Sequence, residues 1–423
     1  MIRHMQYSQR GSTDYRYNTA RRQARKHKKR PFLISAACIA LVYMVTIGLW
    51  PIRMEIAATP LVIETPTQAV SLPWPGSGQA ALSATGYGTL GQSGSDDSVP
   101  IASITKTITA LVVLDKKPLD AGAPGPTITL TQADADLYNH YLAIDGTIAP
   151  ASAGFRITQY DAMRAMLLPS ANNYADTLAS WAYDSLGEYV VAANAFLKQH
   201  GLDGTTVADA SGFSPESKST SKDLLAIGKM VLDSPVLRDI VSQESAAIPG
   251  IGTLRNTNVL LGELGIMGIK TGTTDEAGRC LLFASQHQVG DETVSVIGVV
   301  LGATSYPALH AAVRSLLSSA QQAFTETTVV EASTAVARYK APWGSSVDGV
   351  ASTDLVAAQW PDLALKSSVS LQSIAVGETP QRVGNISIEG HVSGPSADVV
   401  TSQSLGGPNV FWRLTHPMQV LGF

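Results

Sequence analysis

Residues 99–114, which read VPIASITKTITALVVL, place Ser103 and Lys106 three residues apart at the start of an apolar run. The apolar residues that follow recur at helical spacing, so this stretch predicts a helix that begins near Ser103. Residues i and i+3 share one face of a helix, which lets the Lys106 amine approach the Ser103 hydroxyl. Two interpretations follow. Either Ser103 only caps a helix, or Lys106 makes it a nucleophile.

The order of three short motifs decides between these interpretations. A lone S-x-x-K pattern is weak, since it recurs at Ser219 and Lys222. The chain, however, carries Ser103-x-x-Lys106, then Ser170-Ala171-Asn172, then Lys270-Thr271-Gly272. This order is typical of enzymes that form an acyl-enzyme on an active serine. Ser219 follows the second motif and therefore cannot belong to the first. For Ser170 the plain alternative is a polar helix end, and for the third motif a strand that enters a turn.

The proposed chemistry requires an unprotonated lysine. A lysine with an ordinary pKa near 10.4 is protonated at neutral pH and cannot act as a base. Burial and a second nearby cation both lower such a pKa, and Lys270 can supply the cation. The start of the helix also offers free backbone N–H groups where an oxyanion would form.

Other site classes find little support in the sequence. GYGTLG (86–91) matches G-x-G-x-x-G in letters, but no helix follows to bind a pyrophosphate, so a loop between strands explains these glycines better. The eight histidines include no pair at i, i+4 and no H-E-x-x-H, so no metal site is predicted. No G-x-S-x-G elbow is present either.

With these motifs the sequence resembles the serine D-alanyl-D-alanine carboxypeptidases, the low-molecular-weight penicillin-binding proteins. The resemblance extends from about Ala80 to Phe324 and includes SANNYADTLA, DASGFSPESKSTSKDL, LRNTNVLL and GIKTGTTDEAGRCLL. It implies an α/β (α+β) penicillin-binding/β-lactamase-like transpeptidase fold with a helical insertion. The strand-like QAALSATGYGTL, GIMGIKTGT, RCLLFASQ and VSVIGVVLG and the mainly helical residues 134–200 fit that fold.

The resemblance also implies roles for individual residues, without a cofactor. Ser103 would attack the carbonyl between the two terminal D-alanines of a peptidoglycan stem peptide, with Lys106 as base. Ser170 would relay a proton, Asn172 would hold Lys106 and the substrate amide, and Lys270 would support Ser170 and the substrate carboxylate. The backbone N–H groups of Ser103 and Thr273 would form the oxyanion hole. β-Lactams would acylate Ser103.

The chain departs from the family at three places. Asn173 stands where many members have aspartate, which we expect to be tolerated. Many members place an arginine soon after LGA to bind the terminal carboxylate, but here none occurs before Arg314. We therefore expect Lys270, Thr271, Gly272, Thr273 and Arg279 to bind substrate, with Thr271, Thr273 and Arg279 as the carboxylate candidates. We also expect the N-terminal span to replace the amphipathic C-terminal anchor that is usual in the family.

The N-terminus predicts a membrane anchor. Residues 1–30 carry ten Lys and Arg against one acid, and residues 31–52 are 22 uncharged residues, long enough to span a bilayer. No Lys or Arg occurs from Met54 to Ala102, so the positive-inside bias places the basic tail in the cytosol and the remainder outside. A cleavable signal peptide is the alternative, although its apolar region is usually shorter. A basic tail beside a span commonly serves topology, so no nucleic-acid partner is predicted.

The remaining chain divides by composition. Residues 53–76, with four prolines, predict a linker, residues 77–323 the D,D-peptidase catalytic domain, and residues 324–423, with short alternating runs, an all-β accessory domain. Cys38 lies in the span and Cys280 outside it, so we expect no disulfide between them and a buried Cys280.

The sequence therefore predicts a membrane-anchored D,D-carboxypeptidase that trims peptidoglycan stem pentapeptides. Two alternatives stay open: a D,D-endopeptidase that cleaves cross-links, and a catalytically weak penicillin-binding scaffold. A β-lactamase is disfavoured because residues 173–200 contain one glutamate, Glu188, outside an E-x-x-L-N motif.

Overall fold

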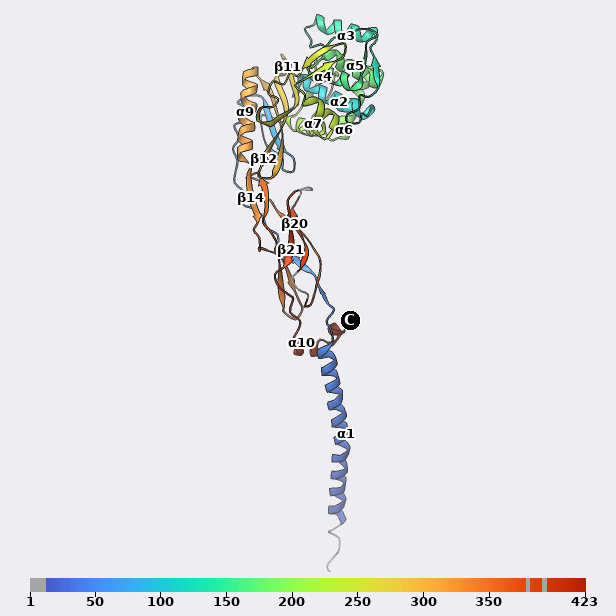
Figure 1. The fold of residues 1–423 in the computed structure, drawn as a ribbon, viewed down its shortest axis with the longest axis vertical. Coiled ribbons are helices and arrows are strands. Elements are labelled where there is room, and N and C mark those ends of the chain that lie inside the picture. The colour runs from blue at the N-terminus through green and yellow to red at the C-terminus, as the bar shows by residue number, and fades with distance from the viewer. Residues whose placement is uncertain (1–12, 378–380, 390–393) are drawn as a thin grey trace, which may run out of the picture.

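The computed structural model describes residues 13–377, 381–389 and 394–423. Figure 1 shows an elongated molecule with an α/β unit at one end and a β-rich unit in the middle. The N-terminal helix α1 (Thr13–Leu49) extends from the opposite end. All three sequence motifs lie in the α/β unit, the part of the molecule farthest from α1.

The α/β unit is built on a five-stranded antiparallel sheet in the order β11-β12-β13-β3-β4. In the chain, β3 and β4 precede a helical insertion, and β11, β12 and β13 follow it. The predicted strands are confirmed as β3 (Gln79–Ala84), β4 (Gly88–Ser93), β11 (Ile266–Thr274), β12 (Gly278–Val289) and β13 (Glu292–Ala303). The glycine-rich GYGTLG stretch forms the β3–β4 hairpin, as expected.

Both faces of this sheet are covered, which explains why residues 280–284 of β12 are all apolar. Successive side chains of a strand point to opposite faces. Leu281 and Phe283 pack with α9 (Tyr306–Ala323) on one face, whereas Leu282 and Ala284 enter the core formed with the helical insertion. Cys280 is fully buried, as predicted.

The helical insertion lies between β4 and β11. Its helices are the short 3₁₀ turn η1 (Ala102–Ile104), α2 (Thr105–Lys116), α3 (Gln132–Ala143), α4 (Gln159–Leu167), α5 (Asn172–Tyr183), α6 (Leu186–Gln199), α7 (Ser221–Asp233) and α8 (Pro235–Val241). Three short two-stranded antiparallel sheets accompany them: β5 (Val99–Pro100) with β8 (Lys218–Ser219), β6 (Thr127–Thr129) with β7 (Arg156–Thr158), and β9 (Ser245–Ile248) with β10 (Gly252–Arg255). A second 3₁₀ turn, η2 (Glu263–Gly265), precedes β11.

Side-chain caps fix where several of these helices begin. A Thr or Ser precedes the helix and accepts the backbone N–H of an acidic residue three positions later, which satisfies an otherwise unpaired donor. This pattern occurs at α3, α4, α6 and α7. At α7 the cap is Thr220, so the second S-x-x-K pattern lies across a helix start, and Ser219 bonds the Thr205 hydroxyl at 2.7 Å.

The β-rich unit follows α9 and confirms the predicted change of texture. Its six-stranded sheet has the order β18-β20-β21-β16-β15-β2, and β14 pairs with β17. Val336, Tyr339, Ile386 and Val399 are fully buried in its own core. The strands are β14 (Thr325–Val330), β15 (Ala335–Lys340), β16 (Ser346–Ala351), β17 (Leu355–Gln359), β18 (Ser367–Leu371), β19 (Ile374–Ala375), β20 (Arg382–Ile388) and β21 (Ser396–Thr401).

Residues 53–76 do not form the free linker that their prolines predict. β1 (Glu55–Ile56) pairs with β19, and β2 (Ala58–Pro60) adds an edge strand beside β15. An edge strand tolerates Pro60, because only one of its sides pairs with another strand. The N–H that proline lacks would be needed only on the paired side. Farther along, Leu72 is buried in the core beneath α9. This segment therefore belongs to both folded units.

The all-β expectation for residues 324–423 is wrong at its C-terminal end. After β21 the chain forms α10 (Val410–Thr415) and α11 (Pro417–Leu421). The Asn409 side chain accepts the Trp412 N–H and starts α10, and Pro417 occupies the first turn of α11, a position that needs no donor. These helix-start signals are local, but the prediction extended the alternating strand pattern to residue 423 and overlooked them.

The predicted span lies within α1. Residues Arg30–Leu49 form a 20-residue stretch of mean hydropathy 2.4 that is long and apolar enough to cross a membrane. The helix ends at Leu49, whereas the sequence predicted a span to residue 52, because Pro51 follows closely and cannot continue a helix. Length and composition alone fit an anchor or a signal sequence equally. Residues 1–12 of the predicted basic tail lie outside the described residues.

Candidate active site

Ser103 and Lys106 lie side by side where the chain enters α2. Ser103 belongs to the 3₁₀ turn η1, and Lys106 is in the first turn of α2. The Lys106 Nζ atom is 2.8 Å from the Ser103 Oγ atom. Lys106 is completely buried, while Ser103 is half-buried and faces a cleft. The Ser103 side chain caps no helix, so its hydroxyl is free for the lysine.

Three acceptors surround the Lys106 amine. Besides Ser103, Nζ lies 2.7 Å from the Asn172 Oδ1 atom and 2.8 Å from the Ser211 carbonyl oxygen. A neutral amine can donate to Asn172 and Ser211 and still accept the Ser103 hydroxyl proton. Burial lowers the pKa of Lys106 to about 7, although the Asp209 and Asp176 carboxylates oppose the shift. The site therefore supplies a base that is substantially neutral at physiological pH.

The two carboxylates near Lys106 have their own partners. Asp176 accepts the Tyr141 hydroxyl at 2.8 Å, and burial raises the pKa of Asp176 to about 6. Asp209 accepts backbone N–H groups from Gly212, Phe213 and Ser214. It thereby shapes the turn that carries the Ser211 carbonyl toward Lys106. Sequence reasoning quoted this stretch but assigned it no structural role.

The second motif connects α4 to α5. Ser170 adopts a left-handed backbone conformation, with φ of 69°, and its side chain reaches the cleft. Residues outside glycine rarely adopt this conformation, and where they do the strain is often tied to function. Asn172 begins α5 and points its amide oxygen at Lys106. Among the described residues, Ser170 makes no side-chain hydrogen bond to Lys270 or Ser103.

Asn173, the departure from the expected aspartate, has a structural explanation. Its Nδ2 donates to the Ala149 carbonyl at 2.9 Å, and its Oδ1 accepts the Ala149 N–H at 3.1 Å. A carboxylate could accept from that N–H but could not donate to the carbonyl. The asparagine therefore satisfies both the donor and the acceptor of Ala149 in this loop.

The third motif lies on β11. Lys270 is almost fully buried, and its Nζ atom is 3.5 Å from the Thr271 Oγ1 atom. Burial, and then repulsion from Lys106, hold the pKa of Lys270 well below its usual value. Thr271 and Thr257 share a hydrogen bond of 2.6 Å at the cleft. Lys106 and Lys270 are thus two buried amines close enough to influence each other.

Gly272 allows β11 to approach the nucleophile. A Cβ atom at this position would lie 2.7 Å from the Ile101 carbonyl oxygen and 3.3 Å from the Ser103 backbone nitrogen. Only a residue without a side chain permits this separation, because real Cβ contacts are longer. The motif glycine therefore sets the distance between Ser103 and the strand that continues to Thr273.

Substitution of Gly272 tests this close approach. We expect Gly272→Ala to reduce acylation by a β-lactam by about a hundredfold, because a displacement of about 1 Å in a reacting group can cost that much. Gly187→Ala is the matched control, since a Cβ there meets nothing closer than 4.0 Å. Stopped-flow acylation with nitrocefin, together with melting temperatures, would separate a local effect from unfolding. An unchanged acylation rate in Gly272→Ala would contradict the assigned role.

The motifs converge on a cleft of about 340 Å³. Its lining residues are Ser103, Thr147, Ser170, Thr257, Val259, Thr271, Gly272, Thr273, Tyr306 and His310. Sequence reasoning missed Tyr306 and His310, which enter from the first turns of α9. The sequence gives one indication of them: they lie in the first turns of α9, which begins directly after β13 ends at Ala303.

Arg279 does not line this cleft. Its guanidinium lies over the Tyr306 ring, 5.7 Å from the centroid. The Tyr306 hydroxyl is in turn 2.9 Å from the Thr273 Oγ1 atom. The structure thus brings Ser103, Ser170, Thr271, Gly272 and Thr273 to one cleft. Lys106 contacts Ser103 and Asn172, and Lys270 contacts Thr271, without lining the cleft themselves. The structure places Arg279 behind a tyrosine that the sequence analysis did not consider.

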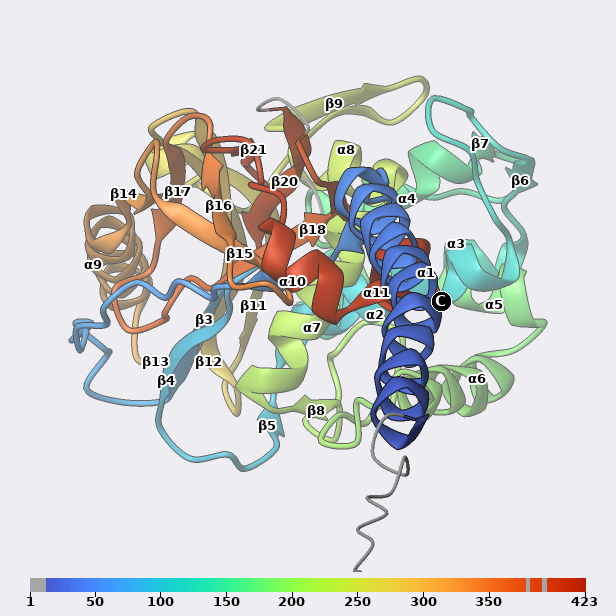
Figure 2. The same ribbon diagram turned by 90° about the horizontal axis from the view of Figure 1, so that it is seen from below.

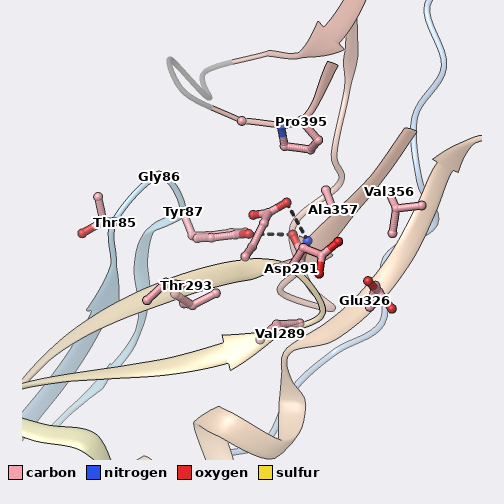
Figure 3. Close-up of a pocket in the computed structure, with 14 residues that line it drawn as sticks. Thr85, Gly86, Tyr87, Val289, Asp291, Thr293, Glu326, Val356, Ala357 and Pro395 are labelled. Atoms are coloured by element: carbon pink, nitrogen blue, oxygen red, sulfur yellow. Dashed lines mark hydrogen bonds between the residues drawn. The ribbon is translucent and has the colours of Figure 1, made fainter. Parts of the chain in front are cut away.

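A larger cavity, of about 750 Å³, lies far from these residues, between the end of the sheet and the β-rich unit (Figure 3). There the Tyr87 hydroxyl donates to the Ala358 carbonyl at 2.6 Å, and Glu292 accepts the Ala358 N–H at 3.3 Å. These bonds join the two units. Because none of the three motifs contributes to it, this cavity is not the candidate active site.

Known proteins resemble the chain over the same region. The family model described as D-alanyl-D-alanine carboxypeptidase, peptidase S11, matches residues 84–305. A D-alanyl-D-alanine endopeptidase of Haemophilus influenzae is 29% identical over 50% of this chain and 71% of its own length. A D-alanyl-D-alanine carboxypeptidase of Streptomyces sp. strain K15 is 29% identical over 58% of this chain and 87% of its own.

A solved structure extends the likeness to most of the fold. Penicillin-binding protein 5 of Haemophilus influenzae superposes with a TM-score of 0.56 at 20% identity, over 80% of this chain and 100% of that one. This identity supports the fold alone. The coverage exceeds the family match, so the likeness extends beyond the α/β unit.

Proposed function

Because this chain belongs to the D-alanyl-D-alanine carboxypeptidase family, peptidase S11, we propose that it is a serine D,D-carboxypeptidase. It removes the terminal D-alanine from peptidoglycan stem pentapeptides. The observation that carries this proposal is the buried Lys106 amine, 2.8 Å from a Ser103 hydroxyl that opens into a cleft. Residues 77–323 form the catalytic domain, and residues 324–423 the accessory domain.

The reaction divides into acylation and hydrolysis. Neutral Lys106 accepts the Ser103 proton while Oγ attacks the carbonyl carbon between the two D-alanines. The backbone N–H groups of Ser103 and Thr273 stabilise the oxyanion, since Gly272 holds the two segments close. The bond to the leaving D-alanine then breaks, and its nitrogen takes a proton delivered through Ser170. Water finally attacks the acyl-enzyme and restores Ser103.

Asn172 and Lys270 position the reacting groups. Asn172 fixes the Lys106 amine through its 2.7 Å contact and orients the lone pair toward Ser103. Lys270 lies beside Thr271, and its amine can donate hydrogen bonds to the substrate carboxylate. A scaffold without catalysis has no use for two buried lysines, whose burial costs stability. These contacts therefore favour the enzyme over the scaffold.

We place the terminal carboxylate against Thr271 and Thr273. Both threonines line the cleft, whereas Arg279 contributes from behind Tyr306. Thr273→Val should raise KM for a diacyl-D-Ala-D-Ala peptide by about tenfold or more, because a hydrogen bond to a charged group contributes about 1.5–3 kcal/mol. Steady-state D-alanine release measures this, with the exposed Thr253→Val on β10 as control. An unchanged KM would move the carboxylate site elsewhere.

The same cleft argues against rapid β-lactam hydrolysis. None of the described residues that line it carries a carboxylate to activate a deacylating water. We expect a penicilloyl adduct that persists for many minutes and no turnover of nitrocefin at enzyme-like rates. Intact-protein mass spectrometry after removal of excess penicillin would follow the adduct. Loss of the adduct within seconds would identify a β-lactamase instead.

Cleavage of cross-links is the second candidate function, because one of the relatives described above is an endopeptidase. Both reactions use the same chemistry and differ in the leaving group. Purified full-length protein should be assayed on defined monomeric pentapeptide and cross-linked dimeric muropeptides. The carboxypeptidase proposal requires preferential release of free D-alanine from the monomer. Preferential conversion of dimers to monomers would assign the endopeptidase instead.

We further propose that α1 anchors the enzyme, with its basic N-terminus in the cytosol and the remainder outside the membrane. The apolar stretch Arg30–Leu49 and the charge asymmetry of the flanks support this orientation. The catalytic domain lies at the end of the molecule farthest from α1 (Figure 1). This arrangement holds Ser103 at a distance from the bilayer, in the region that peptidoglycan occupies.

A further inference from the structure

The carboxyl group of Asp176 takes no part in the proposed reaction, although it is buried beside the catalytic base. Asp176 lies on α5 four residues after Asn172, so the two side chains share one face of that helix. Asn172 contacts the Lys106 amine, and Asp176 is 5% exposed. A buried carboxyl group is costly without partners, so the groups around Asp176 show what holds it there.

Tyr141 of α3 is the hydrogen-bond partner of Asp176. Its hydroxyl donates to the Asp176 Oδ2 atom at 2.8 Å and lies 3.5 Å from the Ser211 Oγ atom. Helices α3 and α5 lie side by side in Figures 1 and 2. A Cβ atom at Gly146 would lie 2.8 Å from the Tyr141 Cδ1 atom and 3.1 Å from the Asn172 Nδ2 atom. The loop is therefore packed tightly against this cluster, which fixes the direction of the Tyr141 hydroxyl.

Charged groups from several elements act on Asp176. Burial raises the pKa of Asp176 to about 6, and the hydrogen bond from Tyr141 opposes that shift. The Asp209 carboxylate raises the same pKa, whereas the Lys106 ammonium lowers it. Other titratable groups on the helices packed against α5 have partners of their own: Asp134 accepts the Thr177 hydroxyl, Tyr189 bonds Thr109, and Asp161 pairs with Arg164. Lys106 and Asp176 therefore interact as opposite charges inside the protein.

An ionised Asp176 makes Lys106 a stronger base. Burial lowers the pKa of Lys106 to about 7, and without Asp209 and Asp176 this pKa would be lower still. A general base is most effective when its pKa lies near the working pH. Asp209 also shapes the turn at Ser211, so its replacement would change geometry as well as charge. Asp176 allows the effect of the charge to be tested alone.

We propose that Asp176 is a positioning residue that acts through Lys106: its negative charge sets the pH above which the amine takes the serine proton. This inference rests on the proposed acyl transfer at Ser103 and adds the group that matches the base to its working pH. Asp176 does not line the cleft. Its carboxylate stabilises the Lys106 ammonium that exists once the proton has moved. Tyr141 keeps this carboxylate ionised, because a hydrogen bond to the charged form favours that form.

The experiment records acylation by nitrocefin between pH 5 and 9 in the full chain and its variants, by stopped flow. Asp176→Asn keeps an oxygen that can accept the Tyr141 hydroxyl but removes the charge. The Lys106 ammonium then loses a stabilising partner, so we expect the midpoint of the rise in acylation to move down by about one pH unit. Glu188→Gln, which removes an exposed carboxylate on α6, is the matched control and should leave the midpoint in place.

A second variant tests the part assigned to Tyr141. Tyr141→Phe should move the midpoint in the same direction by a smaller amount, because the Asp176 carboxyl loses the bond that favours its ionised form. The double variant should match Asp176→Asn, since Tyr141 acts through that charge. A merely structural role for the pair would lower the melting temperature or the acylation rate at every pH and leave the midpoint near pH 7.

The failure of this inference differs from the failure of the proposed function. An unmoved midpoint in Asp176→Asn would overturn the inference, while acylation of the natural chain keeps the proposed function. Should Asp176→Asn not fold, an unmoved midpoint in Tyr141→Phe has the same meaning. If the natural chain is not acylated at any pH, the proposed function is overturned, and this inference with it.

Discussion

Ser103→Ala should abolish covalent labelling by fluorescent penicillin and release of D-alanine together. The Ser103 hydroxyl lies 2.8 Å from the buried amine of Lys106, and no other described serine contacts this amine through its hydroxyl. In serine hydrolases, removal of the nucleophile costs about a millionfold in rate, so the residual activity should fall below detection. Gel fluorescence and D-alanine release measure the two losses.

The matched control is Ser219→Ala, which alters the second S-x-x-K pattern. Ser219 bonds the Thr205 hydroxyl and does not line the cleft, so labelling should persist. Mass spectrometry of the labelled natural protein should place the penicilloyl group on the peptide that contains Ser103. Labelling that survives in Ser103→Ala, with a melting temperature like that of the natural chain, would overturn the assignment.

Lys106→Arg should be nearly inactive although it preserves the positive charge. A guanidinium cannot release its proton at working pH, whereas burial lowers the pKa of the Lys106 ammonium to about 7. The deprotonated amine is the active form, so acylation by penicillin in the natural enzyme should rise with pH through about 7 and then level off. Stopped-flow acylation between pH 5 and 9 would record both results.

Lys270 provides the control on this pH profile. Burial, and then repulsion from Lys106, lower the pKa of Lys270, whereas burial is what lowers the pKa of Lys106. Lys270→Met should weaken substrate capture, while the rise in acylation stays near pH 7. Acylation by Lys106→Arg at close to the natural rate would show that Lys106 supplies only a positive charge and is not the base. The Ser103 proton would then leave through Ser170.

Much of the fold follows from local signals that a sequence displays openly. The strands around Lys270 and Phe283 read as apolar runs, and α4 and α7 begin at Thr or Ser caps followed by an acid three residues later. These patterns act over a few residues, because backbone hydrogen bonds and side-chain alternation are short-range. The C-terminal helices escaped prediction since they are short and follow many strands.

Residues 53–76 illustrate the limit of such signals. Four prolines and little periodicity predict an unstructured segment, yet β2 pairs with β15 across more than 270 residues of sequence. An edge strand can contain prolines and polar residues, because one of its sides does not pair with another strand. Its place depends on which distant strand is available, and that information is absent from the segment itself.

By itself the sequence determined the family, the order of the three motifs and the residue types that acyl transfer needs. It also determined the apolar stretch in α1, since length and hydropathy suffice for that. Only the tertiary structure decided that Asn172 and the Ser211 carbonyl, 66 and 105 residues away from Lys106, meet its amine. It alone brought Tyr306 into the cleft and turned Arg279 behind it. The reason is physical: a lysine's pKa and a cleft's lining depend on burial and packing between distant segments, which no local pattern encodes.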